Sequence, residues 1–218
     1  YYGYARQDRK AAPRVPITAR LVADMYEAAG IDRVVTIDLH AGQIQGFFNI
    51  PVDNLYGSVT FENYIKSKNL KNPIIASPDI GGVARARYFA SRMGLDMVIV
   101  DKRRQKANES EVMNIIGDVQ GKDVIMIDDM VDTAGTMVKA ATALKNKGAA
   151  SVMACATHAV LSGKAYENLD NGELDELIVT NTLESKQHKK IIVLTVAPLF
   201  AEVIRRVYHN ESVNSLFA

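Results

Sequence analysis

Apolar positions along the chain fall into two patterns, short uninterrupted runs and longer stretches with helical spacing. The run Val124–Ile127 is too short for a buried helix and is bounded by polar residues, which is typical of a central strand in a parallel sheet covered on both faces. Similar runs predict strands at 33–37, 73–76, 97–100, 112–116, 151–157, 176–180 and 191–194. The stretches between them predict helices at 15–29, 61–68, 83–93, 137–147 and 199–208. Strands that alternate with helices predict an α/β fold, in which helices flank a parallel sheet.

Several other segments carry weaker signals. Pro16 suits the first turn of the first helix, and Gly30 suits its C-terminal cap. Residues 41–48 predict a short turn or helix that packs inward, whereas residues 51–54 are interpreted as a crossover into a second half of the chain. A loop that contains Ser and Gly is expected to begin at His158.

The stretch from Val124 to Thr136 is the centre of the predicted site. Two adjacent acids, Asp128 and Asp129, stand at the carboxyl end of its strand, and small residues then lead to the helix expected from Met137. A strand, a small-residue loop and a helix start together form a cradle for phosphate, because free backbone N–H groups and the positive end of the helix dipole converge there. The loop lacks the lysine and the glycine spacing of a nucleotide P-loop.

The two acids narrow the choice of ligand. Carboxylates beside a phosphate cradle repel the phosphate, so we expect them to accept hydrogen bonds from neutral hydroxyls a short distance away. A sugar phosphate meets both demands, because it carries hydroxyls as well as an anionic group. The alternative interpretation is a strand that merely ends in a solvated Asp-Asp turn.

Three further loops are expected at the same edge of the sheet, because ligands of open α/β sheets collect where strands end. Asp38 and His40 follow the first predicted strand, and alternation places them on the same side of an extended segment, where a structural role and a metal or phosphate role are both open. In Ser77–Gly82 an acid precedes two glycines, so the backbone can approach a phosphate and the acid can meet its Mg²⁺, with a tight turn as the alternative. The charge run 101–110 suits either a solvated loop or, with strand 112–116, a cationic flap that closes over an anion.

Composition sets limits on the class of protein. The formal net charge of +1 gives no basic field, so nothing supports nucleic-acid binding, and 218 residues suffice for one large or two modest domains. A single cysteine, Cys155, excludes an internal disulfide and agrees with a reducing cytosol. No apolar run is long enough to span a membrane, and no signal peptide is visible. The chain starts at Tyr1 in a loop-like segment without methionine, so we expect the natural N-terminus to lie upstream.

Four stretches together carry a family resemblance. They are Arg6-Gln7-Asp8, Asp38-Leu39-His40-Ala41, Ser77–Gly82 with Asp101-Lys102-Arg103-Arg104, and Asp128–Thr136. Their combination and order resemble the ribose-phosphate pyrophosphokinases, also called phosphoribosyl pyrophosphate synthetases. The resemblance runs along the whole chain and implies two phosphoribosyltransferase-like α/β halves, of which the first is incomplete here. It implies a remnant of the first half at 1–54, the C-terminal domain at 55–197, and a helix at 198–218 that returns to the first half.

The activity that the resemblance implies is transfer of the β,γ-diphosphoryl group of ATP to the C1 hydroxyl of ribose 5-phosphate, which gives phosphoribosyl pyrophosphate and AMP for nucleotide biosynthesis. It also implies Mg²⁺ as the cofactor and a cytoplasmic homo-oligomer, commonly a hexamer in the family, that binds neither nucleic acid nor membranes.

The same resemblance implies roles for individual residues. Asp128 and Asp129 would hold ribose hydroxyls. The 5-phosphate would be held by Asp132, Thr133, Ala134, Gly135 and Thr136. Arg6 and Gln7 would bind the nucleotide. His40 and Asp79 would lie at the Mg-ATP. Lys102 and Arg104 would neutralise charge on the group in transfer.

One departure and two rival functions accompany the resemblance. The family usually has an acid where Asn49 stands, so a metal or regulatory ion site there would be weakened. A phosphoribosyltransferase would share Asp128–Thr136, but it has no need of the Arg6-Gln7 segment or the cationic flap. A non-catalytic, synthetase-associated regulatory subunit would keep the fold, yet it has no chemical use for an intact Lys102 or Asp79.

Overall fold

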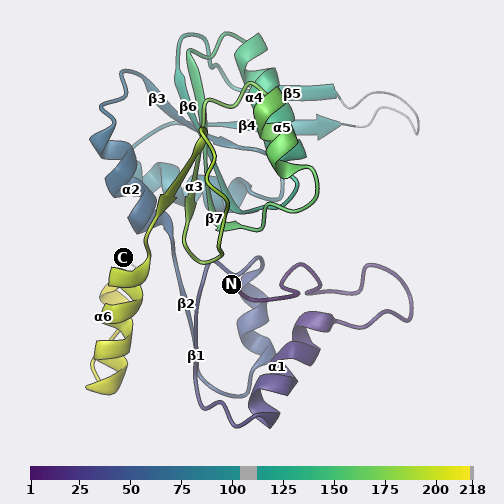
Figure 1. Ribbon diagram of the computed structural model, residues 1–218, viewed down its shortest axis with the longest axis vertical. Coiled ribbons are helices and arrows are strands. Elements are labelled where there is room, and N and C mark those ends of the chain that lie inside the picture. The colour runs from purple at the N-terminus through teal and green to yellow at the C-terminus, as the bar shows by residue number, and fades with distance from the viewer. Residues whose placement is uncertain (104–111, 217–218) are drawn as a thin grey trace. The chain divides into compact units, whose positions relative to one another are not determined.

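The computed structural model describes residues 1–103 and 112–216. The chain divides into two compact units (Figure 1). Unit 1 comprises Tyr1–Gly57 and Ala197–Ala218, and unit 2 comprises the continuous segment Ser58–Val196. The predicted central stretch therefore lies within unit 2.

Unit 2 is built on a seven-stranded sheet with the strand order β5-β4-β3-β6-β7-β8-β9. Neighbouring strands run parallel, except that β4 and β5 pair antiparallel. The strands are β3 (Pro73–Ser77), β4 (Met97–Arg103), β5 (Val112–Ile116), β6 (Asp123–Val131), β7 (Ser151–Ala159), β8 (Glu176–Thr180) and β9 (Ile191–Leu194).

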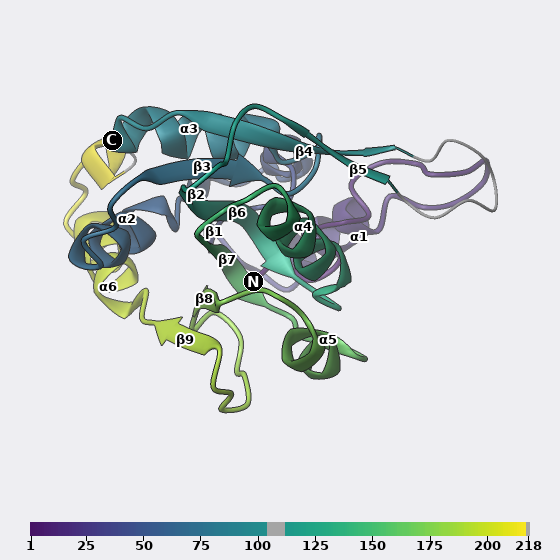
Figure 2. The ribbon, with the colours of Figure 1, turned by 90° about the horizontal axis from the view of Figure 1, so that it is seen from above.

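Helices cover both faces of this sheet (Figure 2). They are α2 (Ser58–Ser67) and α3 (Val83–Met93) on one face, and α4 (Gly135–Asn146) and α5 (Ala165–Asn171) on the other. Ile125 packs in the cluster that contains Phe89 of α3, whereas Met126 packs in the cluster that contains Met137 of α4. The side chains of β6 are apolar on both faces of the sheet, because helices cover both faces. The predicted α/β fold class is confirmed.

The chain reverses its direction of travel across the sheet between β3 and β6. These strands are parallel neighbours, with Ala76 beside Met126. After β3 the chain passes through α3 to β4, and after β6 it passes through α4 on the opposite face to β7. The loops after β3 and β6 therefore leave in opposite directions, and the crevice between them is the preferred ligand position in sheets of this kind.

Unit 1 contains a parallel pair of strands, β1 (Val34–Ile37) and β2 (Val52–Leu55), with Val34 paired to Val52. Its helical elements are α1 (Thr18–Ala28), the 3-10 helix η1 (Gly42–Phe47), α6 (Ala197–Tyr208) and the 3-10 helix η2 (Asn214–Leu216). Tyr2 is buried in its core, where the ring packs edge-on against Phe48 and the hydroxyl donates to the Ala19 carbonyl at 2.7 Å. Ile44 of η1 is fully buried, which confirms the inward packing predicted for residues 41–48.

Three local expectations were wrong. Residues 52–55 form strand β2, where a crossover was expected, because their hydrogen bonds are taken up by β1. Strand β7 continues to Ala159, so the Ser- and Gly-containing loop that was expected to begin at His158 begins two residues later. Strand β4 runs through Arg103, so the charge run does not begin as a loop; Asp101 is buried at 4% exposure.

Across the described ranges, none of the helices combines the length and the apolar character that crossing a membrane requires.

Candidate functional site

The acid pair lies inside the carboxyl-terminal part of β6, so the strand extends past the point at which the sequence was expected to turn. Asp129 is buried, with its side chain 3% exposed, whereas the side chain of Asp128 is 25% exposed. Both carboxylates face one cation from α3. Arg85 Nη1 lies 3.2 Å from Oδ1 of Asp128 and 3.1 Å from Oδ1 of Asp129.

The electrostatic balance at this pair favours a proton on Asp128. Burial is the largest cause that raises the pKa of Asp128, and the neighbouring Asp129 carboxyl raises it further, to about 7. Arg85 and the backbone N–H of Asp129, which donates to Asp128 Oδ1 at 2.9 Å, act in the opposite direction. A ligand that donates hydroxyl hydrogens would add to the groups that favour the ionised carboxylate.

Arg85 was not predicted as a site residue. It stands in the first turn of the helix that follows the two glycines of the loop after β3, and it reaches across to the next strand of the sheet. Three arginines lie in this helix, and the sequence alone does not single out the one that faces β6. The signal that could have identified Arg85 is its position directly after the loop Ser77–Gly82, in a helix that follows a neighbour of the strand with two acids.

The predicted phosphate loop connects β6 to α4. Asp132, Thr133 and Ala134 form the turn, and Gly135 and Thr136 begin the helix. Ala134 adopts a left-handed backbone with φ 60°, which is unfavourable for a residue with a Cβ, and it has no polar side chain with which to cap the helix. Thr133 and Thr136 are exposed, so their hydroxyls are accessible to an anion, and the first-turn N–H groups of α4 have no acceptor within the helix.

This loop is supported by the segment that follows β7. The backbone N–H groups of Leu161 and Ser162 donate to the carbonyls of Val131 and Asp132, each at 3.0 Å. The Ser162 hydroxyl donates to Asp132 Oδ1 in a short hydrogen bond. From α5, Asn168 Nδ2 donates to the Thr133 carbonyl at 2.8 Å. None of these supporting contacts was predicted.

The second rim loop, after β3, is a tight turn built around Asp79. Asp79 Oδ1 accepts from the Gly82 N–H at 2.8 Å, and the Ser77 hydroxyl donates to the Asp79 carbonyl at 2.6 Å. A Cβ on Gly82 would lie 3.0 Å from Ser77 Oγ, so a side chain there would crowd the turn. Asp79 therefore has a fixed position at the carboxyl end of β3, which pairs with β6, the strand that carries Asp128 and Asp129.

The remaining predicted residues are distributed over both units. Arg6, Gln7 and His40 are exposed in unit 1, and the Gln7 carbonyl accepts from the N–H of Ala19 at the start of α1. Asp38 has φ 45°, so the segment is not extended there and the argument from alternation was wrong. Its Oδ2 accepts from the Gly57 N–H at 2.9 Å, which is a structural contact.

Asn49 has a clear structural partner. Its backbone N–H and its side-chain Nδ2 donate to the two carboxylate oxygens of Glu27, at 2.6 Å and 3.0 Å. These bonds are the leading causes that lower the pKa of Glu27. An acid at position 49 could not donate the second of these bonds, so the amide matches Glu27.

Two predicted cations belong to the flap. Lys102 lies in β4, where it is paired with Met113 of β5. Arg104 lies outside the described residues. In the part of the chain that the structure describes, no group of three or more His, Cys, Asp or Glu side chains gathers in a way that could enclose a metal ion.

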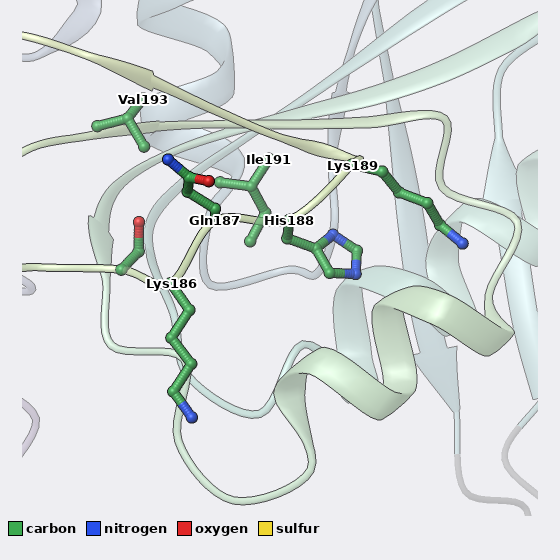
Figure 3. A pocket seen from close by; sticks show the side chains of 7 residues that line it. Lys186, Gln187, His188, Lys189, Ile191 and Val193 are labelled. Atoms are coloured by element: carbon green, nitrogen blue, oxygen red, sulfur yellow. The ribbon is translucent and has the colours of Figure 1, made fainter.

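A pocket of about 490 Å³ is formed by the segment between β8 and β9 together with residues of β9 (Figure 3). It is lined by Ser185, Lys186, Gln187, His188, Lys189, Ile191 and Val193. Lys186 and Lys189 extend in different directions, and Lys189 pairs with Asp170 at 3.1 Å. None of the predicted site residues lines it, and its cations do not converge on one point.

The sequence of this chain is similar to two family models and to named relatives. Residues 102–218 match the family model described as "Phosphoribosyl synthetase-associated domain", and residues 1–30 match "N-terminal domain of ribose phosphate pyrophosphokinase". Proteins named ribose-phosphate pyrophosphokinase from Wolinella succinogenes and Campylobacter jejuni are each 74% identical over all 218 residues, which span 71% of each relative's length.

A solved structure gives the same result. The crystal structure of phosphoribosylpyrophosphate synthetase from Mycobacterium smegmatis superposes with a TM-score of 0.89 at 42% identity. The superposition covers 96% of this chain and 70% of the other. The similarity therefore extends over nearly the whole chain, and it includes both the acid strand and the phosphate loop.

Proposed function

Because this chain belongs to the ribose-phosphate pyrophosphokinase family, we propose that it transfers the β,γ-diphosphoryl group of ATP to the C1 hydroxyl of ribose 5-phosphate. The products would be phosphoribosyl pyrophosphate and AMP. The observation that carries this proposal is the juxtaposition of the Asp128–Asp129 pair with an uncapped helix start only a few residues later. One strand, loop and helix thus present acceptors for hydroxyls and donors for a phosphate within nine consecutive residues, Asp128–Thr136.

The sugar end of the ligand is assigned to the acid pair. Ionised Asp128 and Asp129 would accept hydrogen bonds from the 2- and 3-hydroxyls of the ribose, and Arg85 and the ribose hydroxyls would together favour the ionised form of the pair. The 5-phosphate would be bound by the backbone N–H groups of residues 133–136 and by the hydroxyls of Thr133 and Thr136, with the dipole of α4 behind them.

In unit 1 the nucleotide is assigned to Arg6, Gln7 and His40. In unit 2 the Mg²⁺ of the nucleotide is assigned to Asp79. Mg²⁺ prefers oxygen ligands and is commonly held by one or two carboxylates together with substrate phosphates, so it does not require a cage made of protein alone. Asp79 fits that role, because its carboxyl is held at the rim by Gly82. When bound with ATP, the metal would offset charge on the phosphates. The proposal includes a homo-oligomeric assembly, as the family resemblance implies.

The transfer step is assigned to cations of the flap. Phosphoryl-type transfer leaves little covalent work for a protein, so in-line positioning and electrostatic stabilisation account for most of the acceleration. Lys102 and Arg104 would neutralise the charge that develops on the diphosphoryl group as it moves. The C1 hydroxyl would be presented by a sugar whose other end is fixed by the acid pair and the phosphate loop.

The direct test is product analysis with the full-length protein made from its complete gene. We expect AMP to be released from ATP only when ribose 5-phosphate and Mg²⁺ are both present, with phosphoribosyl pyrophosphate as the second product. Synthesis of a nucleotide from phosphoribosyl pyrophosphate and a base would instead indicate a phosphoribosyltransferase. Binding of both substrates without any AMP would indicate the non-catalytic regulatory subunit.

A second prediction concerns Arg85. We expect Arg85→Met to raise the pKa of Asp128 further, because the cation that offsets two carboxylates is lost. Ribose 5-phosphate binding should then weaken about tenfold at pH 7 and recover as the pH is raised to about 9, since one pKa unit corresponds to about 1.4 kcal/mol. Calorimetric titrations across this pH range measure the effect, and Arg85→Lys should retain part of the affinity. An equal loss at every pH would show that Arg85 does not act through the ionisation of the acids.

A further inference from the structure

The phosphate loop contains an acid whose position conflicts with a direct role in phosphate binding. Asp132 is the first residue of the loop after β6, and a carboxylate that touched the phosphate would repel it. Its Oδ1 accepts a short hydrogen bond from the Ser162 hydroxyl, and its carbonyl accepts from the Ser162 N–H at 3.0 Å. Ser162 therefore binds both the side chain and the backbone of Asp132.

A second contact supports Thr133, the residue that follows Asp132 in the loop. Asn168 Nδ2 donates to the Thr133 carbonyl at 2.8 Å from helix α5. This helix ends close against α4, because a Cβ on Gly172 would lie 2.2 Å from Val138 Cγ1, a separation that only glycine permits. Asn168 thus reaches the loop from a helix that is itself fixed to the helix following the loop.

The loop has a physical reason to need such support. Ala134 holds a left-handed backbone at φ 60°, which costs about 1–2 kcal/mol for a residue with a Cβ. A strained residue persists only where the surrounding structure holds its backbone in place. The contacts from Ser162 and Asn168 fall on the two residues directly before Ala134, at the point where the strain would otherwise be released.

We propose that Ser162 and Asn168 are positioning residues for the phosphate loop, and that the Asp132 carboxylate serves as the acceptor for Ser162 and not as a ligand of the sugar phosphate. This inference rests on the proposed function in one respect, namely that the loop holds the 5-phosphate of ribose 5-phosphate. The phosphate itself would be bound by N–H and hydroxyl groups whose geometry these three side chains set.

The binding test compares variants in the full-length protein by calorimetry. Ser162→Ala and Asn168→Ala should each weaken ribose 5-phosphate binding about tenfold, because each variant loses one hydrogen bond on which the geometry of the loop depends. ATP affinity should be unchanged, because its proposed ligands lie elsewhere. The matched control is Asn171→Ala, which changes an exposed asparagine at the C-terminal end of the same helix and should bind both ligands as the natural protein does.

The role of Asp132 is tested by two substitutions at one position. Asp132→Asn keeps an acceptor oxygen for Ser162 and should bind ribose 5-phosphate within about threefold of the natural protein, whereas Asp132→Ala should match the loss in Ser162→Ala. The double variant Asp132→Ala/Ser162→Ala should be no weaker than either single variant, because both remove the same bond. An Asn variant as impaired as the Ala variant would show that the charge itself contacts the ligand or its metal, and the proposal would fail.

A measurement without ligand separates this inference from the proposed function. Amide hydrogen exchange of residues 133–136 should accelerate about tenfold in Ser162→Ala and Asn168→Ala relative to Asn171→Ala. Unchanged exchange would overturn the positioning role, whatever the protein binds. Accelerated exchange in a protein that binds no ribose 5-phosphate would uphold the positioning role and reject the proposed function.

Discussion

Replacing Asp128 by asparagine should make the protein more stable at pH 8 and at the same time weaken its binding of ribose 5-phosphate. The pKa of Asp128 is raised to about 7 in the folded protein, chiefly by burial and then by Asp129. A carboxyl with a raised pKa contributes stability below its unfolded value, near pH 4, and loses that contribution as the pH rises through about 7. At pH 8 the folded protein therefore holds an unfavourable charge, which the neutral amide removes.

The expected gain in unfolding free energy is on the order of 2 kcal/mol at pH 8, less than the full pKa shift corresponds to, because the Asp128 side chain is 25% exposed and solvent screens its charge. Affinity for ribose 5-phosphate should fall at least tenfold, since an amide is a weaker acceptor than a carboxylate. Urea denaturation at pH 5 and pH 8 measures the first effect, and calorimetry measures the second. The gain should shrink toward pH 5, where Asp128 is already protonated in the natural protein.

Asp123 provides a control with the opposite sign at the other end of the same strand. Its carboxylate accepts from the Ser151 hydroxyl and from the N–H groups of Asn72 and Lys71, and the Ser151 bond is the largest cause that lowers its pKa. Its contribution is present above the unfolded pKa and is lost as the pH falls, so Asp123→Asn should destabilise the protein at pH 8. If both variants changed stability in the same direction at pH 8, the electrostatic account of the acid pair would be wrong.

The largest effect on turnover is expected for Lys102→Ala. Lys102 lies in β4, two strands away from the acid pair in the sheet order, so its removal leaves the proposed sugar and phosphate ligands intact. A cation that acts on the group in transfer stabilises the transition state more than the bound substrate, so kcat should fall about 10³-fold while the affinity for ribose 5-phosphate changes little.

Steady-state kinetics of AMP release by the full-length protein, combined with calorimetry, separate these two quantities. Lys147→Ala is a suitable control, because it removes the same charge from an exposed lysine at the C-terminal end of α4. Undiminished turnover in Lys102→Ala would refute the assigned role. A parallel loss of ribose 5-phosphate binding would assign Lys102 to substrate binding.

Local patterns in the sequence were sufficient for most of the architecture. The run Val124–Ile127 and the acids that follow it predicted a central strand, a rim loop and a helix, because burial on both faces and the need for a helix start leave local signatures. Strand β2 was missed because its two consecutive polar residues, Asp53 and Asn54, resemble a turn. Its strand character comes from pairing with β1, which no local window contains.

The parts of the site that were not predicted all depend on contacts between distant segments. Arg85 lies 43 residues from Asp128, and Asn168 lies 35 residues from Thr133. Side-chain type and local spacing locate the end of a strand, but they do not tell which helix crosses it or which of three arginines faces inward. The tertiary arrangement supplies that information, and it shows that an acid expected at the phosphate, Asp132, is engaged by Ser162.

The discontinuity of unit 1 has a consequence for how the protein is made. Unit 2 is a continuous segment and can complete its sheet as soon as Val196 has left the ribosome, whereas unit 1 still lacks α6 at that moment. During translation the earlier part of unit 1 must therefore wait, unfinished, until a complete unit 2 has been synthesised. A message with a stop codon shortly after residue 196 would yield a chain whose unit 2 is whole and whose unit 1, without α6, is exposed to proteases.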